Sequence, residues 1–504
     1  MLEEYVQRIL DARVYDVAKV SSLQEATIMS GRLNNTVSLK REDEQQVFSF
    51  KLRGAYNCMV RLSDEQKQRG VIAASAGNHA QGVALSAKKL NIKAIIVMPE
   101  TTPQIKVDAV RAHGAEVVLI GDSYDDASNH AALLVAEHGM TYVHPYDNPD
   151  VIAGQGTVAV EIMEQHDGPI EAIFIPVGGG GLAAGITAYM RSLHPEVKII
   201  AVEPADAACL QVAIAEGERV VLDDVGIFAD GVAVKQIGEE TFSILNGRVD
   251  EVLTVSTDEM CAAIKDIFDD TRAIAEPAGA LALAGLKNYV EQTGIVGKNL
   301  VAIVSGANTN FDRLRYISER TEIGERREAV LCVTIPEQPG AFREFCATIG
   351  GRMVTEFNYR YSSAAEAHVF VGLQVAPDGV DTQALIAQLE AKGYAVQDFT
   401  DNEIGKLHIR HMVGGHSDAV SDEKVYRFEF PERPGALMTF LSKLGHNWNI
   451  SLFHYRNHGA AYGSILVGLE VPDDEQSQLQ VFMDELGYVH SEETDNPAYQ
   501  LFLA

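Results

Sequence analysis

The chain has 504 residues, of which 46% are hydrophobic, so it can form two or more globular domains with a large core. Its formal net charge of −30 argues against nucleic acid and anionic membranes as partners, because both are negatively charged. The five cysteines show no C-x-x-C spacing and indicate reduced thiols of a cytoplasmic protein, and no apolar run approaches the ~20 residues that span a bilayer.

The first element is a predicted amphipathic helix at residues 4–12, whose acidic start does not resemble a secretory signal. The chain then reaches Ser49-Phe50-Lys51-Leu52, where a polar loop precedes a helix predicted from Ala55 to about Gln68. Phe50 and Leu52 could partly desolvate Lys51, which would lower its pKa and make the amine a usable nucleophile or base. The alternative interpretation is a surface lysine whose stem lies along apolar neighbours.

From residue 71 onward, short apolar runs alternate with longer helical periods, a pattern typical of an α/β fold. Each run is continuously apolar, so the strands should be covered on both faces and form a doubly wound, mostly parallel sheet. We expect this domain to span residues 1–320, with one lobe at about 45–147 and the remainder as the other. The predicted strands are Val71–Ala74, Ala94–Met98, Val117–Ile120, Thr141–Val143, Ile173–Val177, Ile199–Val202 and Leu300–Val304.

Small polar clusters follow three of these predicted strands. They are Ser75-Ala76-Gly77-Asn78-His79-Ala80-Gln81-Gly82, Gly178-Gly179-Gly180-Gly181-Leu182 and Ser305-Gly306-Ala307-Asn308. The carboxyl ends of parallel strands are where open α/β sheets bind ligands, so we expect the clusters to share one site. The glycine run favours a phosphate there, because backbone N–H groups at a helix N-terminus can approach an anion closely.

The lysine stretch and the three clusters, in this order, resemble the fold-type II pyridoxal-phosphate enzymes, and most closely the biosynthetic threonine deaminases. The resemblance covers nearly the whole chain. It implies a two-lobed catalytic domain, pyridoxal 5'-phosphate as cofactor and assembly as a homotetramer. It also implies elimination of water and ammonia from L-threonine, with L-serine as a further substrate, to give 2-oxobutanoate in the committed step of isoleucine biosynthesis.

The resemblance also implies a role for each matching residue. Lys51 would form the Schiff base, Asn78 would bind the ring hydroxyl, and Ser305 would face the pyridine nitrogen. A hydroxyl at Ser305 would let that nitrogen stay neutral, which favours elimination over transamination. The substrate carboxylate would be bound by Ser75, Gly77, Asn78 and His79, with a purely structural role as the alternative for His79. The phosphate would be held by Gly178, Gly179, Gly180, Gly181 and Leu182.

The glycine run also fits a dinucleotide fingerprint, because Glu203 closes the next strand about 20 residues later. A dehydrogenase would leave Lys51, the cluster after Val71–Ala74 and the C-terminal third without a role, so the pyridoxal-phosphate interpretation is preferred. A β-replacement synthase of the same fold and a non-catalytic amino-acid sensor remain as alternatives. No metal-ligand cluster is evident, and Cys209 stands where related serine racemases would place an acidic cation ligand, so we expect no metal.

After a charged linker at 321–328 the sequence repeats itself, and we expect one unit at 329–412 and a second at 424–504. Val333–Ala341 aligns with Phe428–Ala436, through a shared Pro-Glu-x-Pro-Gly turn. The units resemble the α+β, ferredoxin-like ACT-type regulatory domains of the same family, which implies feedback inhibition by isoleucine that valine opposes. One alternative is that the two units only hold an oligomer together. Another is that the tyrosines of the candidate effector pairs are core residues and the arginines form surface ion pairs. The candidate effector residues are the pairs Tyr359-Arg360 and Tyr455-Arg456.

Overall fold

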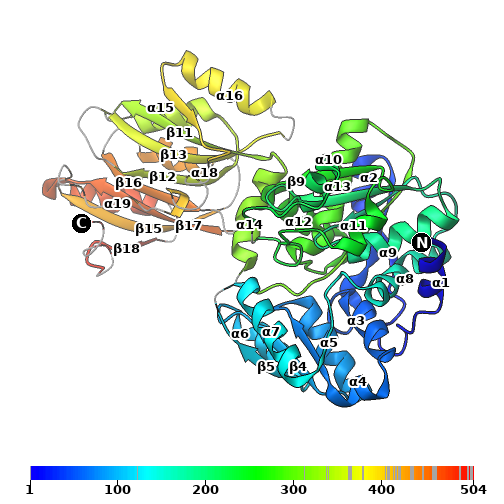
Figure 1. The fold of residues 1–504 in the computed structure, drawn as a ribbon. Helices are drawn as coiled ribbons and strands as arrows, with labels where there is room; N and C mark the ends of the chain where they lie inside the picture. Colours follow the sequence, from blue (N-terminus) through cyan, green and yellow to red (C-terminus); the bar gives the residue numbers. More distant parts are fainter. Residues whose placement is uncertain are drawn as a thin grey trace. The chain divides into compact units, whose positions relative to one another are not determined.

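The computed structural model divides the chain into two compact units, Met1–Thr321 and Glu322–Ala504, each described here by itself. None of the described helices is long and apolar enough to cross a membrane. The ribbon is drawn in Figure 1. The structure describes residues 2–121, 123–226, 228–311, 313–336, 338, 340–360, 366–376, 380–402, 405, 409–411, 414, 417, 420, 422–431, 436–444, 448–456, 462–486, 488, 490–496, 499 and 503.

A six-stranded sheet forms the centre of the first unit. All neighbouring strands are parallel except β1, which is antiparallel to β2. Successive residues of β7 enter different cores: Phe174 packs with α2, α12 and α13, whereas Ile173 and Ile175 pack with α1, α8 and α9. The strands are therefore covered on both faces, as their continuous hydrophobicity predicts. In order across the sheet they are β1 (Leu23–Glu25), β2 (Thr36–Arg41), β10 (Asn299–Val304), β7 (Ala172–Pro176), β8 (Lys198–Pro204) and β9 (Glu251–Val255).

A second, four-stranded parallel sheet forms the smaller lobe of this unit. Two of its strands coincide with the predicted ranges, and the outer strand β5 begins and ends one residue earlier than expected. The α/β fold class and the doubly wound, mostly parallel arrangement are thereby confirmed. Across the sheet the strands are β5 (Glu116–Leu119), β4 (Ala94–Met98), β3 (Val71–Ala74) and β6 (Thr141–Tyr142).

One helical prediction needs correction. The helix expected from Ala55 to Gln68 is two helices: α3 starts at Lys51 and ends at Val60, and α4 spans Asp64–Arg69. The break occurs because Ser63 and Gln66 form a capping box that starts a new helix. The other helices of this unit are α1 (Leu2–Leu10), α2 (Thr27–Leu33), η1 (Glu42–Glu44), α5 (Asn78–Leu90), α6 (Gln104–Ala112), α7 (Tyr124–His138), α8 (Pro149–Gln165), α9 (Gly181–Leu193), α10 (Cys209–Glu216), α11 (Glu239–Leu245), α12 (Thr257–Thr271) and α13 (Pro277–Thr293). Helix α14 (Arg313–Gly324) begins in this unit and ends in the second.

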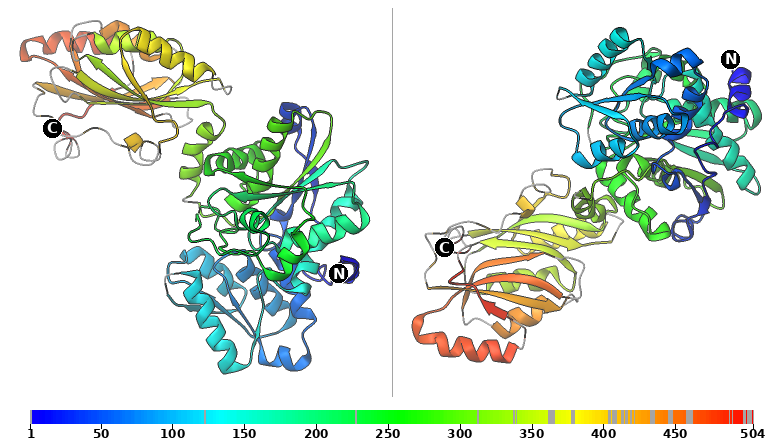
Figure 2. Two further views of the ribbon diagram at one scale, coloured as in Figure 1. Left: turned by 45° about the horizontal axis from the view of Figure 1, so that its top comes forward. Right: turned by 90° about the horizontal axis from the view of Figure 1, so that it is seen from below.

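The second unit contains the predicted duplication. Each repeat contributes four strands to one eight-stranded antiparallel sheet, and the two halves join where β12 pairs with β16. Helices cover one face of this sheet (Figure 2). The order is β14 (Ala395–Asp398), β11 (Glu328–Pro336), β13 (Glu366–Gln374), β12 (Val354–Arg360), β16 (Asn449–Arg456), β17 (Tyr462–Glu470), β15 (Glu423–Pro431) and β18 (His490–Glu492), with α15 (Ala341–Ile349), α16 (Val380–Ala391), η2 (Ile409–His411), α18 (Ala436–Leu444), η3 (Asp473–Glu475) and α19 (Gln476–Leu486).

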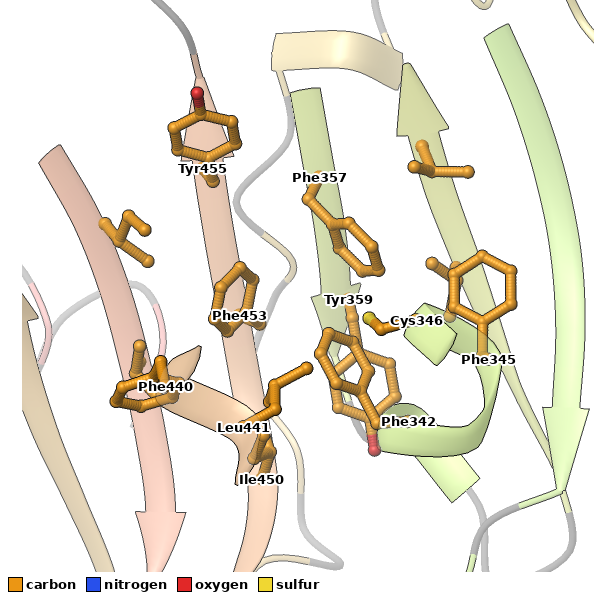
Figure 3. Packing of buried hydrophobic residues seen from close by; sticks show 14 of the residues in the cluster. Phe342, Phe345, Cys346, Phe357, Tyr359, Phe440, Leu441, Ile450, Phe453 and Tyr455 are labelled. Carbon is orange, nitrogen blue, oxygen red and sulfur yellow. The ribbon is translucent and has the colours of Figure 1, made fainter. Parts of the chain in front are cut away.

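An aromatic cluster crosses the seam between the two repeats. The Phe342 ring lies 4.9 Å from that of Phe357 and 5.4 Å from that of Phe453, measured between centroids (Figure 3). Tyr359 and Tyr455 belong to the same buried cluster. Because aromatic side chains bury large areas, this cluster holds the repeats together as one unit. The tyrosines therefore have the core positions that the alternative interpretation expected.

Candidate active site

Lys51 lies where three segments of the first unit meet. Its Nζ donates a hydrogen bond to the carbonyl oxygen of Pro145 at 3.1 Å and lies 5.3 Å from the Phe50 ring centroid. Burial lowers the pKa of Lys51 to about 8, while the nearby carboxyl of Glu276 opposes that shift. A pKa near 8 leaves about a tenth of the amine neutral at pH 7, far more than an ordinary lysine provides.

The backbone on either side of Lys51 is fixed to the end of β10. Phe50 N donates to Ser305 O at 3.3 Å, and Ser49 pairs with Gly306 as an isolated bridge. The lysine predicted for the Schiff base and the serine predicted to face the cofactor ring therefore come from adjacent backbone segments.

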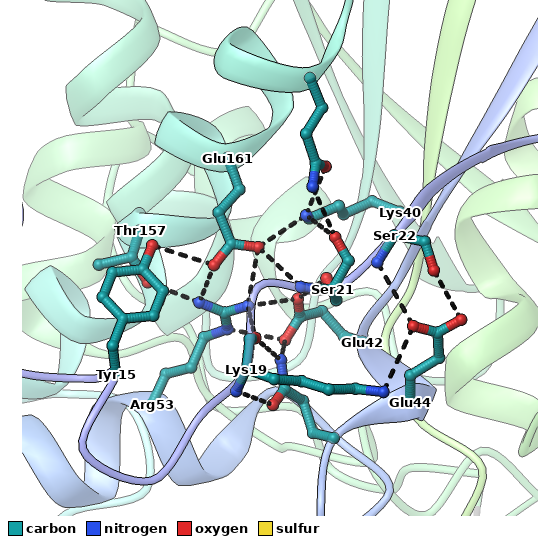
Figure 4. Close-up of polar contacts among 12 residues, drawn as sticks. Tyr15, Lys19, Ser21, Ser22, Lys40, Glu42, Glu44, Arg53, Thr157 and Glu161 are labelled. Carbon is teal, nitrogen blue, oxygen red and sulfur yellow. Dashed lines mark hydrogen bonds and ion pairs between the residues drawn. The ribbon is translucent and has the colours of Figure 1, made fainter.

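A buried ion network holds the helix that follows Lys51 (Figure 4). Arg53 donates to Glu42 Oε2 at 2.8 Å and to Glu161 Oε1 at 2.6 Å, and Lys40 Nζ donates to Glu161 Oε2 at 2.7 Å. All four side chains are fully buried. The ion pair between Arg53 on α3 and Glu161 on α8 holds these two helices together, so the first turn of α3, which contains Lys51, cannot shift freely.

The tetraglycine loop connects β7 to α9, and its close contacts leave little room for side chains. A Cβ at Gly179 would lie 2.2 Å from Cδ1 of Tyr146, and one at Gly178 would lie 2.8 Å from Cα of Val232. Gly180 is the N-cap of α9 with φ +90°, and no side chain caps this helix. Among the described residues, no side chain accepts from the N–H groups at the start of α9, and such an arrangement suits a phosphate.

The polar cluster at residues 75–82 lies at the start of α5. The helix begins at Asn78, and its N-cap residue is Gly77, which has no side chain to cap it. Ser75 Oγ accepts a hydrogen bond from Gly77 N at 3.3 Å, which shapes the turn. His79 Nε2 lies 2.8 Å from Val143 O, and burial lowers the pKa of His79 to about 3. The imidazole is therefore neutral, with Nε2 bound to the backbone and Nδ1 buried without a hydrogen-bond partner among the described residues, so both a structural role and a role toward the substrate stay open.

Ser305 ends up beside residues that sequence reasoning did not single out. Its hydroxyl donates to Ala278 O at 3.2 Å, and the side chain is buried. Burial raises the pKa of Glu276 to about 7, with Asp230 adding to the shift. Glu276 accepts a hydrogen bond from Asn78 Nδ2 at 2.6 Å.

Three features of this site were missed from the sequence: Glu276, Asn308 and the loop with Pro145 and Tyr146. Asn308 lies within a cluster that the sequence does mark, and Glu276 precedes the proline that opens α13. Tyr146 carried no local signal, because its role comes from packing against the glycine loop. Among the described residues, no group of three or more His, Cys, Asp or Glu side chains could hold a metal ion.

The chain matches two family models: pyridoxal-phosphate dependent enzyme over residues 16–306, and C-terminal regulatory domain of threonine dehydratase over 319–409 and 414–503. The chain belongs to the biosynthetic threonine dehydratases. It is 56% identical to the biosynthetic L-threonine dehydratase of Burkholderia multivorans, over 99% of each chain. Its identity to the Escherichia coli protein of that name is 52%, over 99% of this chain and 97% of that protein.

Solved structures agree with this family. The processed form of threonine deaminase isoform 2 from Solanum lycopersicum matches with a TM-score of 0.62 at 51% identity, covering 63% of this chain and 93% of that chain. A maize serine racemase matches with a TM-score of 0.59 at 30% identity, covering 62% of this chain and 95% of that chain.

Pyridoxal phosphate fits the residues present. The N-terminus of α9 offers uncapped N–H groups beside glycines for the phosphate, and the partly neutral Lys51 amine can form a Schiff base. The Asn78 amide and the Ser305 hydroxyl are neutral polar groups that can hydrogen-bond a pyridine ring and its hydroxyl. The dinucleotide alternative explains none of the groups around Lys51.

The glycine loop yields a first prediction. Gly180→Ala should weaken pyridoxal phosphate binding about tenfold or more, because its Cβ would lie 2.9 Å from Thr241 Oγ1 at a positive φ. The matched control is Gly217→Ala, where φ is +76° but nothing lies within 4 Å of the added atom. Titration of cofactor into each cofactor-free variant measures the effect. If both variants bind pyridoxal phosphate with equal affinity, the phosphate does not bind at the glycine loop.

The pKa of Lys51 yields a second prediction. The rate at which cofactor-free protein forms its Schiff base with pyridoxal phosphate should rise with pH and reach half its maximum near pH 8, because only the neutral amine attacks. Stopped-flow absorbance between pH 6 and 10 provides the measurement. A midpoint near the ordinary lysine pKa of about 10.4 would contradict the desolvation argument.

Proposed function

We propose that this chain converts L-threonine to 2-oxobutanoate and ammonia as the committed step of isoleucine biosynthesis. The observation that carries this conclusion is Lys51, a partly buried lysine with a pKa lowered to about 8, in a chain that belongs to the threonine dehydratases. L-serine is a second substrate, because one methyl group discriminates by only ~1–3 kcal/mol. The resemblance to the biosynthetic threonine deaminases supports a homotetramer as the working form, and the reduced cysteines inferred from the sequence support a cytoplasmic location.

Each residue group has a part in the reaction. The N–H groups at the start of α5, with Ser75, bind the substrate carboxylate, and Gly178 to Leu182 bind the cofactor phosphate. When bound, pyridoxal phosphate supplies an electron sink for the substrate α carbon. Neutral Lys51 removes the Cα proton as the general base. Loss of that proton with the β-hydroxyl releases water, and hydrolysis of the freed enamine gives 2-oxobutanoate and ammonia.

Lys51→Ala should abolish formation of 2-oxobutanoate from threonine and remove the borohydride-reducible link to the cofactor, while the fold survives. The control is Lys88→Ala, because Lys88 is exposed on α5. A 2-oxoacid assay and the mass of the borohydride-treated protein provide the two readouts. A Lys51→Ala enzyme that dehydrates threonine at the wild-type rate would exclude this lysine as the base.

Ser305→Asp should lower the ratio of 2-oxobutanoate to racemised amino acid and pyridoxamine product. A carboxylate beside the ring nitrogen would favour its protonation and stabilise the carbanion long enough for side reactions. Ser305→Ala is the control, since it removes the hydroxyl without adding charge. Chiral chromatography of the amino acids measures the ratio. An unchanged ratio in Ser305→Asp with the cofactor bound would overturn this role.

The C-terminal region carries the proposed regulation, with isoleucine as inhibitor and valine opposing it. We assign residues 1–320 to catalysis and the units 329–412 and 424–504 to effector binding. A pocket in the second unit supports this: it joins the N-terminus of α15, with N-cap Gly340 at φ +95°, to apolar walls from both repeats. The N-terminus of a helix suits a carboxylate, and the walls suit a branched side chain. The walls include Phe342, Tyr359, Leu441, Trp448 and Ile450.

Of the four effector residues expected from the sequence, Tyr359 lines this pocket, whereas Tyr455 packs within the aromatic cluster that crosses the seam. The side chains of Arg360 and Arg456 lie outside the described residues. Arg343 at the start of α15 lines the pocket and offers a guanidinium for the effector carboxylate.

Trp448 is the only tryptophan of the chain and lines the proposed effector pocket. Isoleucine should therefore change the intrinsic fluorescence of the full-length enzyme, with a midpoint that matches inhibition. Arg343→Ala should move both midpoints to higher isoleucine by about tenfold or more without changing activity in the absence of effector. Arg427→Ala, in the second repeat and outside this pocket, serves as control. Inhibition without any fluorescence change would locate the effector elsewhere.

A further inference from the structure

Both ends of the Asn78 amide are held by side chains from other segments. Asn78 Nδ2 donates to Glu276 Oε1 at 2.6 Å, and Asn78 Oδ1 accepts from Asn308 Nδ2 at 2.5 Å. Glu276 is the N-cap of α13, and Asn308 follows β10. Neither residue has a part in the reaction steps above, yet each contacts the residue expected to bind the cofactor ring.

The direction of these bonds follows from a backbone carbonyl. Asn308 Nδ2 also donates to Val47 O at 2.7 Å, and a carbonyl oxygen can only accept. The amide nitrogen of Asn308 must therefore face both Val47 O and Asn78, which requires Asn78 to present its oxygen. The Asn78 nitrogen then points to Glu276, whose carboxylate accepts. The two assignments agree without any flipped amide.

The carboxyl group of Glu276 occupies the space beside Gly306, where a larger residue would not fit. A Cβ at Gly306 would lie 2.3 Å from Oε1 of Glu276, and Glu276 N donates to Gly306 O at 3.1 Å. Glu276 is only 4% exposed, so its carboxyl has little solvent to replace a lost partner. The glycine after Ser305 is thus explained by the space that Glu276 occupies.

We propose that Glu276 and Asn308 are positioning residues that fix the Asn78 amide for the cofactor ring. With one N–H committed to Glu276, the second N–H of Asn78 would remain to donate to the ring hydroxyl oxygen of pyridoxal phosphate. In a flipped amide, Asn78 Oδ1 would face the carboxylate oxygen of Glu276, and these two acceptor oxygens would repel each other. The inference rests on the proposed function, because it uses the same cofactor and the same site.

Cofactor binding to the full-length, cofactor-free protein tests this without turnover. Glu276→Ala and Asn308→Ala should each weaken pyridoxal phosphate binding about tenfold or more, and shift the visible absorption band of the loaded protein. Glu276→Gln keeps an acceptor oxygen of the same shape and should bind within about threefold of wild type. If Glu276→Ala does not fold, Asn308→Ala, which removes no charge, carries the test.

A double-mutant cycle separates positioning from a general structural role. In an Asn78→Ala background, Glu276→Ala should weaken binding by less than about threefold, because the residue through which it acts is gone. Asp266→Asn is the control: Asp266 is a comparably buried carboxylate held by Arg32 and Lys287, and its loss should lower thermal stability but leave cofactor affinity unchanged.

Additive losses in the cycle, or wild-type affinity and spectrum in both alanine variants, would overturn the inference. The proposed function fails differently: a wild-type protein that binds pyridoxal phosphate normally but forms no 2-oxobutanoate from threonine would refute that function and leave the orientation of Asn78 standing.

Discussion

The catalytic unit depends on one buried interaction, the ion network around Arg53. Taking these charges out of water is costly, so the network is favourable only because each charge has partners: Arg53 contacts Glu42 and Glu161, and Lys40 contacts Glu161. Removing one partner from such a network costs about 3–5 kcal/mol. Because Arg53 stands two residues after Lys51, the same constraint fixes the start of α3 against α8 and β2. A reactive amine can then be partly desolvated without being free to move away.

How much of this could be foreseen depends on whether a feature is local. The strands at Val71–Ala74 and Ala94–Met98 were predictable, because a buried parallel strand is a continuous apolar run with a turn after it. The edge strand Glu251–Val255 was not identified, because its burial alternates and no long apolar run marks it. The start of α3 at Lys51 was also missed, since tertiary contacts rather than a capping residue determine it.

The site divides in the same way. The lysine and the three polar clusters follow strands or open helices, so the sequence marks them and the fold brings them together. Glu276 contacts Asn78, which lies 198 residues earlier in the sequence, and Tyr146 contacts the glycine loop about 33 residues later. Both roles arise from packing alone. In the second unit the duplication was visible, but the pairing of β12 with β16 was not, because a repeat does not reveal which edges join. That seam matters, since the proposed effector pocket takes walls from both repeats.

Glycine N-caps connect the catalytic and regulatory chemistry. Among the helices whose N-cap residue the structure describes, α5, α9, α11 and α15 begin after a glycine. In α11 the free N–H groups are taken by a carboxylate of the chain itself, since Asp147 accepts from Glu239 N at 2.9 Å. A helix start of this kind favours an anion through its N–H groups and dipole. Among the described residues, no side chain accepts from the first N–H groups of α5 and α9, which meet the proposed places for the substrate carboxylate and the cofactor phosphate. The start of α15, where Ala341 N donates to Gln338 O, lines the proposed effector pocket. The same local device, found on two unrelated folds, therefore underlies the proposed binding of all three ligands.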